Sequence, residues 1–230
     1  MKKVFNWLNE SSYTEPLSPA CKMCAKGSKM VVLITGLCPA HCFYCPLSSE
    51  KTDKDRIFAD EWELDTEEDV EKLLKEAELI KAEGAGITGG DPLVVWGRTK
   101  KYIKLLKDYF GPDFHIHLYT SGLKNHEKAV DLVEAGLDEI RFHPMITMWN
   151  KMQEVSFYDT ISKLVSMDCD VALEIPVIPG KKEDILQLIK WANNLGIKWI
   201  NLNELEYSEA NAAFLNDKGF AVKDDISSAV

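Results

Sequence analysis

The sequence predicts an α/β fold in which parallel strands alternate with helices, and three observations support this prediction. Apolar runs typical of β-strands recur along the 230 residues, each followed by a stretch with helical spacing. No repeat, low-complexity segment or obvious linker interrupts this alternation. The residues with distinctive chemistry follow the apolar runs, at the carboxyl ends where sites form in parallel sheets.

Six strands are expected, at residues 30–38, 85–93, 114–122, 138–144, 170–180 and 198–207. Amphipathic helices are expected between them, at residues 65–84, 99–110, 125–136, 158–167 and 182–196. In the first helix, apolar residues share one face and Gly84 follows as a stop signal; the face comprises Val70, Leu73, Leu74, Ala77 and Ile80. Helical connections between parallel strands form right-handed crossovers.

Composition and charge limit the classes of function. The net charge is −10, from 37 acidic and 27 basic residues, which disfavours a nonspecific nucleic-acid binder because phosphate contacts need a positive surface. The longest apolar runs are too short to span a bilayer, and the N-terminal sequence MKKVFNWLNESSY lacks the apolar stretch of a signal peptide. A cytoplasmic protein is therefore expected, in which clustered cysteines are metal ligands more often than disulfides.

The cysteines permit two metal-binding interpretations. Cys21, Cys24, Cys42 and Cys45 form two C-x2-C pairs, the pattern of a zinc-ribbon interaction module without enzymatic activity. That interpretation leaves Cys38 unused. Cys38, Cys42 and Cys45 instead form a C-x3-C-x2-C loop after the first strand. Because a [4Fe–4S] cluster usually takes four thiolates, three would leave one iron open for a small molecule.

Four motifs in order resemble the radical S-adenosylmethionine (SAM) superfamily, over residues 31–207. They are the cysteine loop, GGDP at 89–92, YTSG at 119–122 and EIPVIPG at 174–180. Their order is most similar to the branch of pyruvate formate-lyase activating enzymes. The resemblance implies a partial (β/α)6 TIM-like barrel at 31–207. Residues 1–30 then form an N-terminal extension with a CxxC pair, and residues 208–230 resemble the start of a further element of a longer protein.

The resemblance also implies the cofactors and the residues that hold them. An oxygen-sensitive [4Fe–4S] cluster would bind Cys38, Cys42 and Cys45, and SAM would bind the open iron. Asp91 stands where the family commonly has Glu, and Glu174 stands where activating enzymes usually have a basic residue. The residues implied for SAM are Tyr44, Gly89, Gly90, Asp91, Pro92, Thr120, Ser121, Glu174, Ile178, Gly180 and Glu206.

The remaining candidates rest on strand parity or on spacing alone. Arg141 and His143 alternate on one face of the fourth strand, and Asn203 and Glu204 lie at the end of the sixth, so these four are candidate substrate-facing residues. For Cys21 and Cys24, three interpretations stay open: zinc, an auxiliary cluster completed by other ligands, or a reduced pair.

The expected activity is reductive cleavage of SAM, followed by hydrogen abstraction by the 5′-deoxyadenosyl radical. The first candidate substrate is a partner protein that receives a glycyl radical. The alternative is radical modification of a small molecule, lipid or RNA. The resemblance implies an external one-electron donor of the flavodoxin or ferredoxin type.

Overall fold

Eight strands form the main sheet of the computed structural model, which describes residues 3–8, 11–224 and 226–230. The strand order is β10-β9-β8-β7-β6-β3-β4-β5. Six strands pair in parallel, and these are β3 (Lys29–Thr35), β6 (Gly84–Gly89), β7 (His115–Thr120), β8 (Glu139–Phe142), β9 (Asp170–Val177) and β10 (Trp199–Glu204). The expected α/β fold, a partial TIM-like barrel, is confirmed.

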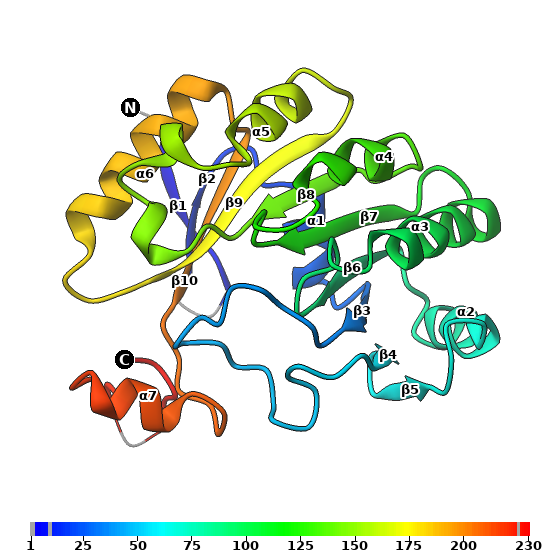
Figure 1. Ribbon diagram of the computed structural model, residues 1–230, viewed down its shortest axis with the longest axis horizontal. Helices are drawn as coiled ribbons and strands as arrows, with labels where there is room; N and C mark the ends of the chain where they lie inside the picture. Colours follow the sequence, from blue (N-terminus) through cyan, green and yellow to red (C-terminus); the bar gives the residue numbers. More distant parts are fainter. Residues whose placement is uncertain (1–2, 9–10, 225) are drawn as a thin grey trace.

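Most helices lie on the two faces of this sheet, while α7 (Ala212–Asp217) lies beyond the carboxyl end of β10 (Figure 1). The other α-helices of the described residues are α1 (Pro19–Ala25), α2 (Val70–Leu79), α3 (Trp96–Phe110), α4 (Ala129–Val133), α5 (Tyr158–Val165) and α6 (Lys182–Leu195). Helices α3 to α6 cover the outer face, whereas α1 lies on the opposite, inner face against β7 and β3. None of the helices in the described ranges is long and apolar enough to cross a membrane.

Several local elements differ from the expectation. The short strands β4 (Ile57–Ala59) and β5 (Trp62–Leu64) extend the sheet beyond β3 in antiparallel pairing, and β1 (Val4–Asn6) and β2 (Ser12–Thr14) form a separate pair. The helix expected at 125–136 starts as a 3-10 turn, η2 (His126–Lys128), before α4. Two more 3-10 turns, η3 (Ile146–Met148) and η4 (Met152–Glu154), precede α5.

The two faces of the parallel strands have opposite chemistry. Side chains alternate between faces along a strand. The outward-facing residues are apolar and buried beneath the helices, among them Met30, Val32, Ile87, Ile116, Leu118, Ile140 and Leu173. The inward-facing positions carry polar residues, among them Lys29, His115, His117, Glu139, Arg141 and Glu174. The apolar core therefore lies between sheet and helices, and the inner face is left for polar contacts.

Candidate active site

Three cysteines lie in the long loop that joins β3 to β4, at the carboxyl end of the sheet. Cys38 and Cys42 are partly buried, and Cys45 is exposed. The backbone N–H of Ala40 donates to Cys38 Sγ at 3.4 Å, and Cys45 N donates to the Cys42 carbonyl at 3.0 Å. Burial raises the pKa of Cys38 to about 11, and the nearby Asp91 carboxyl and the other two thiols act in the same direction.

The donor set of this loop fits a [4Fe–4S] cluster. Thiolates are the ligands that hold such clusters, and three from one loop would leave one iron for SAM. Across residues 3–8, 11–224 and 226–230, no three His, Cys, Asp or Glu side chains are already gathered around one point at metal-binding distances. The base of the loop is nevertheless fixed, because Gly36 N donates to the Lys54 carbonyl at 2.8 Å and Asp53 N donates to the Gly36 carbonyl at 3.0 Å.

The GGDP segment packs directly against the backbone of the cysteine loop. Gly90 N donates to the Thr35 carbonyl at 2.7 Å, and Asp91 N donates to the Leu37 carbonyl at 2.8 Å. A Cβ atom on Gly90 would lie only 2.2 Å from the Leu37 carbonyl oxygen. Gly89 has φ +122°, a backbone conformation that residues other than glycine rarely adopt. The two glycines therefore permit the close approach of two backbone segments.

The Asp91 side chain is fully buried and joins the second and third expected motifs. One carboxylate oxygen accepts from Thr120 Oγ1 at 2.8 Å and the other from Ser121 N at 3.0 Å and Ser121 Oγ at 2.5 Å. Leu93 N donates to the first oxygen at 3.0 Å. Burial raises the pKa of Asp91, and these hydrogen bonds oppose the rise. Asp91 thus fixes the segment Thr120–Ser121 relative to GGDP.

Tyr44 links the cysteine loop to two distant parts of the chain. Its hydroxyl lies 3.0 Å from Nε2 of His143, whose pKa is lowered by burial. Its carbonyl accepts from Asn211 Nδ2 at 3.0 Å, and Asn211 also donates to the Glu206 carbonyl. Phe43 stacks on Phe220. The segment around α7 therefore lies against the cysteine loop, as Figure 1 also shows.

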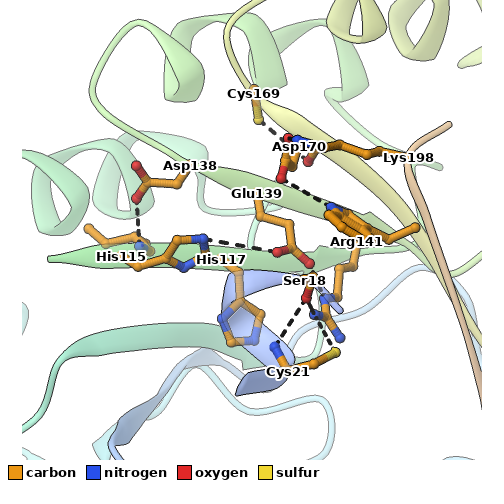
Figure 2. Close-up of polar contacts among 12 residues, drawn as sticks. Ser18, Cys21, His115, His117, Asp138, Glu139, Arg141, Cys169, Asp170 and Lys198 are labelled. Carbon is orange, nitrogen blue, oxygen red and sulfur yellow. Dashed lines mark hydrogen bonds and ion pairs between the residues drawn. The ribbon is translucent and has the colours of Figure 1, made fainter. Parts of the chain in front are cut away.

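Arg141 occupies the centre of the inner face. It is 3% exposed, and its guanidinium pairs with Glu139 at 2.6 Å and with Glu174 at 2.5 Å. Glu174 also accepts from Asn203 Nδ2 at 3.0 Å. On the other side, Arg141 Nη2 donates to Ser18 Oγ at 3.1 Å and to Cys21 Sγ at 3.3 Å, both at α1 (Figure 2). Arg141, Glu174 and Asn203, predicted from three strands, are thus brought together.

The amino-terminal half of the inner face holds a second polar group. Lys29 Nζ lies 2.8 Å from His115 Nδ1 and donates to the carbonyls of His115 and Ala85. Burial lowers the pKa of Lys29 to about 8 and that of His115 to about 4. Among the described residues, His117 Nδ1 and Glu139 Oε2 are buried without a hydrogen-bond partner. This group lies nearer the amino ends of the strands than Arg141, whereas the cysteine loop follows the carboxyl end of β3.

The other predicted residues are more dispersed. Ile178 is buried after β9, and Gly180 follows in a turn with φ +80°, where an added Cβ would have no atom within 4 Å. Glu204 and Glu206 are exposed at and beyond the end of β10. Pro92 accepts from Thr99 Oγ1 at 2.8 Å, which ties GGDP to α3. Cys21 and Cys24 lie on α1, whereas Cys42 and Cys45 lie in the loop between β3 and β4.

Two residues of the site were not found from the sequence. Ser18 caps α1 by accepting from Cys21 N at 3.1 Å, and Pro19 follows it. The Ser-Pro pair before CKMC was a usable helix-start signal. Asn211 had no such signal, because its partners Tyr44 and Glu206 are set by the tertiary fold.

Comparison with known proteins agrees with this geometry. The sequence profile of the radical SAM superfamily matches residues 32–203. A Methanocaldococcus jannaschii protein, described as a proposed glycyl-radical enzyme activating enzyme, is 40% identical over 100% of this chain and 60% of its own length. A Pyrococcus horikoshii protein assigned as a GTP 3′,8-cyclase is 26% identical over 84% of this chain and 61% of its own length.

The solved structures with a similar fold include a radical SAM enzyme. The methyltransferase TsrM from Kitasatospora setae, bound to tryptophan and a SAM analogue, has a TM-score of 0.54 and 12% identity, covering 89% of this chain and 42% of that chain. The present chain spans about three fifths of the length of the Methanocaldococcus jannaschii and Pyrococcus horikoshii relatives. The superfamily match covers most of the chain and includes the cysteine loop, so the protein belongs to the radical SAM superfamily.

Proposed function

We propose that this protein activates a partner protein by abstracting hydrogen from a glycyl residue. The observation that carries the proposal is the 40% identity, across the entire chain, to a relative described in those terms. The cysteine loop, GGDP and Thr120–Ser121 meet at the carboxyl end of the sheet, which supports a shared site for cluster and SAM.

Cys38, Cys42 and Cys45 would hold the cluster. When bound, the cluster would supply one electron for the reductive cleavage of SAM, the chemistry by which a hydrogen atom would be taken from the glycyl Cα. An external flavodoxin or ferredoxin would supply the electron. The role of this chain's own residues is to hold both partners in place and away from water.

SAM would be positioned by residues held in place by Asp91 and by segments that contact the cofactor directly. Asp91 acts through Thr120 and Ser121, because its carboxylate already accepts four hydrogen bonds inside the protein. The segments around Tyr44, Gly89–Pro92, Ile178–Gly180 and Glu206 would contact the rest of the cofactor. Glu174 is held by Arg141 and Asn203, so a contact with SAM would use whatever hydrogen-bonding capacity these partners leave.

The substrate side of the site would be formed by inner-face residues beside the cysteine loop. His143 is held by Tyr44, while Arg141 holds Glu174. Asn203 and Glu204 stand at the end of β10, at the same edge. A glycyl-bearing loop of a partner protein would have to reach this edge, because α1 covers the inner face further toward the amino ends of the strands.

A small-molecule substrate is the second candidate, because a relative assigned as a GTP 3′,8-cyclase is 26% identical over most of the chain. GTP is therefore the probe for that alternative. A zinc ion or auxiliary cluster at Cys21 and Cys24 would need ligands in addition to these two thiols.

The test combines a cluster assay with a substrate comparison. The anaerobically reconstituted protein should bind about four irons per chain and, with dithionite, release 5′-deoxyadenosine from SAM. Cys38→Ala should lose both properties. Cys169→Ala is the matched control, because Cys169 is also a partly buried thiol but lies directly before β9, at the amino ends of the strands. Unchanged iron content and SAM cleavage in Cys38→Ala would refute the cluster assignment.

The substrate arm uses a glycyl radical enzyme from the same genome and, separately, GTP. The activase proposal expects a glycyl radical signal in electron paramagnetic resonance with the protein partner and no consumption of GTP. SAM cleavage that converts GTP while leaving the protein partner without a radical would replace this proposal with the small-molecule alternative.

A further inference from the structure

Helix α1 presents two cysteines from one turn of a seven-residue helix. Cys21 and Cys24 are three residues apart, so their side chains lie on the same face. Helix geometry places their Cα atoms about 5 Å apart, within the range of about 4.4–6.8 Å that disulfides span. Ser18 Oγ accepts from Cys21 N and fixes the start of this turn.

The surroundings of the two sulfurs are unequal. Cys21 is partly buried, and a hydrogen bond from Nη2 of the buried Arg141 reaches its sulfur at 3.3 Å. Cys24 is exposed to solvent. Lys29 and Arg141 are near enough to favour the thiolate of Cys24, although desolvation outweighs them and raises its pKa. One thiol is therefore accessible from outside, and its neighbour is supported by a cation.

This arrangement suits thiol–disulfide exchange better than metal binding. A bare metal cation such as Zn²⁺ is repelled by a neighbouring guanidinium, whereas a thiolate that attacks or leaves during exchange is stabilised by one. Two thiolates alone do not make a closed metal site. A C-x2-C pair in a reducing compartment is also a recognised redox pattern.

We propose that Cys21 and Cys24 form a redox-active dithiol that is oxidised to an intramolecular disulfide by a small-molecule disulfide such as oxidised glutathione. The Cys24 thiolate attacks one sulfur of the oxidant and releases one equivalent of its thiol, leaving a mixed disulfide on Cys24. The Cys21 thiolate then attacks Cys24 Sγ and releases the second equivalent. Two thiol protons and two electrons leave the pair, and the oxidant is reduced to two thiols.

The pair is connected to the carboxyl-end site through one side chain. Arg141 holds Cys21 with one nitrogen and Glu174 with another, and Glu174 in turn holds Asn203. Disulfide formation moves Cys21 Sγ toward Cys24 and changes the hydrogen bond that Arg141 can make to it. The oxidation state of α1 is thereby linked to the polar residues nearest the proposed substrate side.

The test uses the reconstituted full chain under anaerobic conditions, incubated with oxidised glutathione and then alkylated. Trypsin cleaves after Lys22, between the two cysteines, and after Lys26. An intramolecular disulfide therefore appears as two tryptic peptides, residues 4–22 and 23–26, joined through sulfur. The proposal expects this linked pair to accumulate and to disappear after dithiothreitol treatment, while Cys169 stays alkylated in the same sample.

Single variants separate the two thiols. Cys21→Ser should stop at a glutathione adduct on Cys24, because the resolving thiol is missing, and Cys24→Ser should form much less adduct on the partly buried Cys21. Cys169→Ser is the control and should give the wild-type amount of linked peptide. The proposal is overturned if no linked peptides form in the wild-type protein, or if zinc or additional iron binds to it and is lost in Cys21→Ser.

Discussion

Replacing Gly90 with alanine should destabilise the packing of the cysteine loop even in the protein without its cofactors. Its added Cβ would lie 2.2 Å from the Leu37 oxygen, 2.6 Å from the Leu37 carbonyl carbon and 2.7 Å from the Gly36 carbonyl carbon. All three atoms are backbone, so no flexible side chain can move aside. The two segments must separate by about 0.8 Å to restore the 3.0 Å that real Cβ contacts require.

The expected cost follows from that separation. Overpacking of this kind costs about 1–3 kcal/mol, and the bond from Asp91 N to the Leu37 carbonyl is stretched as well. A loss of about 3 kcal/mol lowers the melting temperature of a chain of this size by about 6–12 °C. The loop that carries the cysteines moves with Leu37, so iron retained after reconstitution should fall too.

The assay pairs Gly90→Ala with Gly97→Ala. Gly97 lies in α3 and has no atom within 4 Å of an added Cβ, so alanine there should be neutral or stabilise the helix by about 0.5–1 kcal/mol. Thermal unfolding of the apoprotein and iron content of the reconstituted protein are measured for both. A Gly90→Ala protein with the wild-type melting temperature and full iron content would refute the close-packing argument.

Three further outcomes are expected. Asp91→Asn turns an amide NH2 toward the donors of Thr120 and Ser121, and should lower the free energy of unfolding in urea by about 3 kcal/mol. An unchanged midpoint of urea unfolding would contradict the role of Asp91 as a buried acceptor. The pKa of Lys29, about 8 against 10.5 when unfolded, means that the folded state binds fewer protons between those pH values. Lys29 should therefore contribute up to ~3 kcal/mol more to the free energy of unfolding at the top of that window than at the bottom. The raised pKa of Cys38 acts in the opposite direction in both proteins, so the measured quantity is the difference between the wild type and Lys29→Met in urea unfolding. That difference should grow in favour of the wild type as pH rises, and a difference that does not change with pH would contradict the assignment to Lys29. Asn211→Ala leaves the Tyr44 carbonyl without its donor and should reduce the iron retained after reconstitution. The control is Asn216→Ala, because Asn216 lies on α7 but donates to no part of the cysteine loop. Equal iron content in the two variants would contradict a role for Asn211 in holding the loop.

The sequence predicted the parallel strands because burial on one face leaves a readable pattern. In β7, Ile116 and Leu118 face the helices while His115, His117 and Tyr119 alternate with them. The hairpin β4–β5 was missed because each strand has only three residues, too few for a period to show. Strand alternation over long segments was therefore more informative than local propensity.

The candidate site was predictable by position but not by pairing. Strand ends placed Asp91 near Thr120 and Ser121, and the structure joins them by direct hydrogen bonds. Nothing in the sequence indicated that Arg141 would hold Glu174, since this depends on the register of β8 against β9. The family's basic residue is absent at position 174, but a guanidinium from the neighbouring strand stands beside the carboxylate.

The Asn211 contact has a consequence for how the protein is made. Asn211 is 167 positions beyond Tyr44, yet its amide holds the Tyr44 carbonyl in the middle of the cysteine loop. During synthesis from the N-terminus, the three cysteines leave the ribosome long before this amide exists. The loop can reach its final form only once residue 211 has emerged, so stable cluster insertion is expected after that point in synthesis.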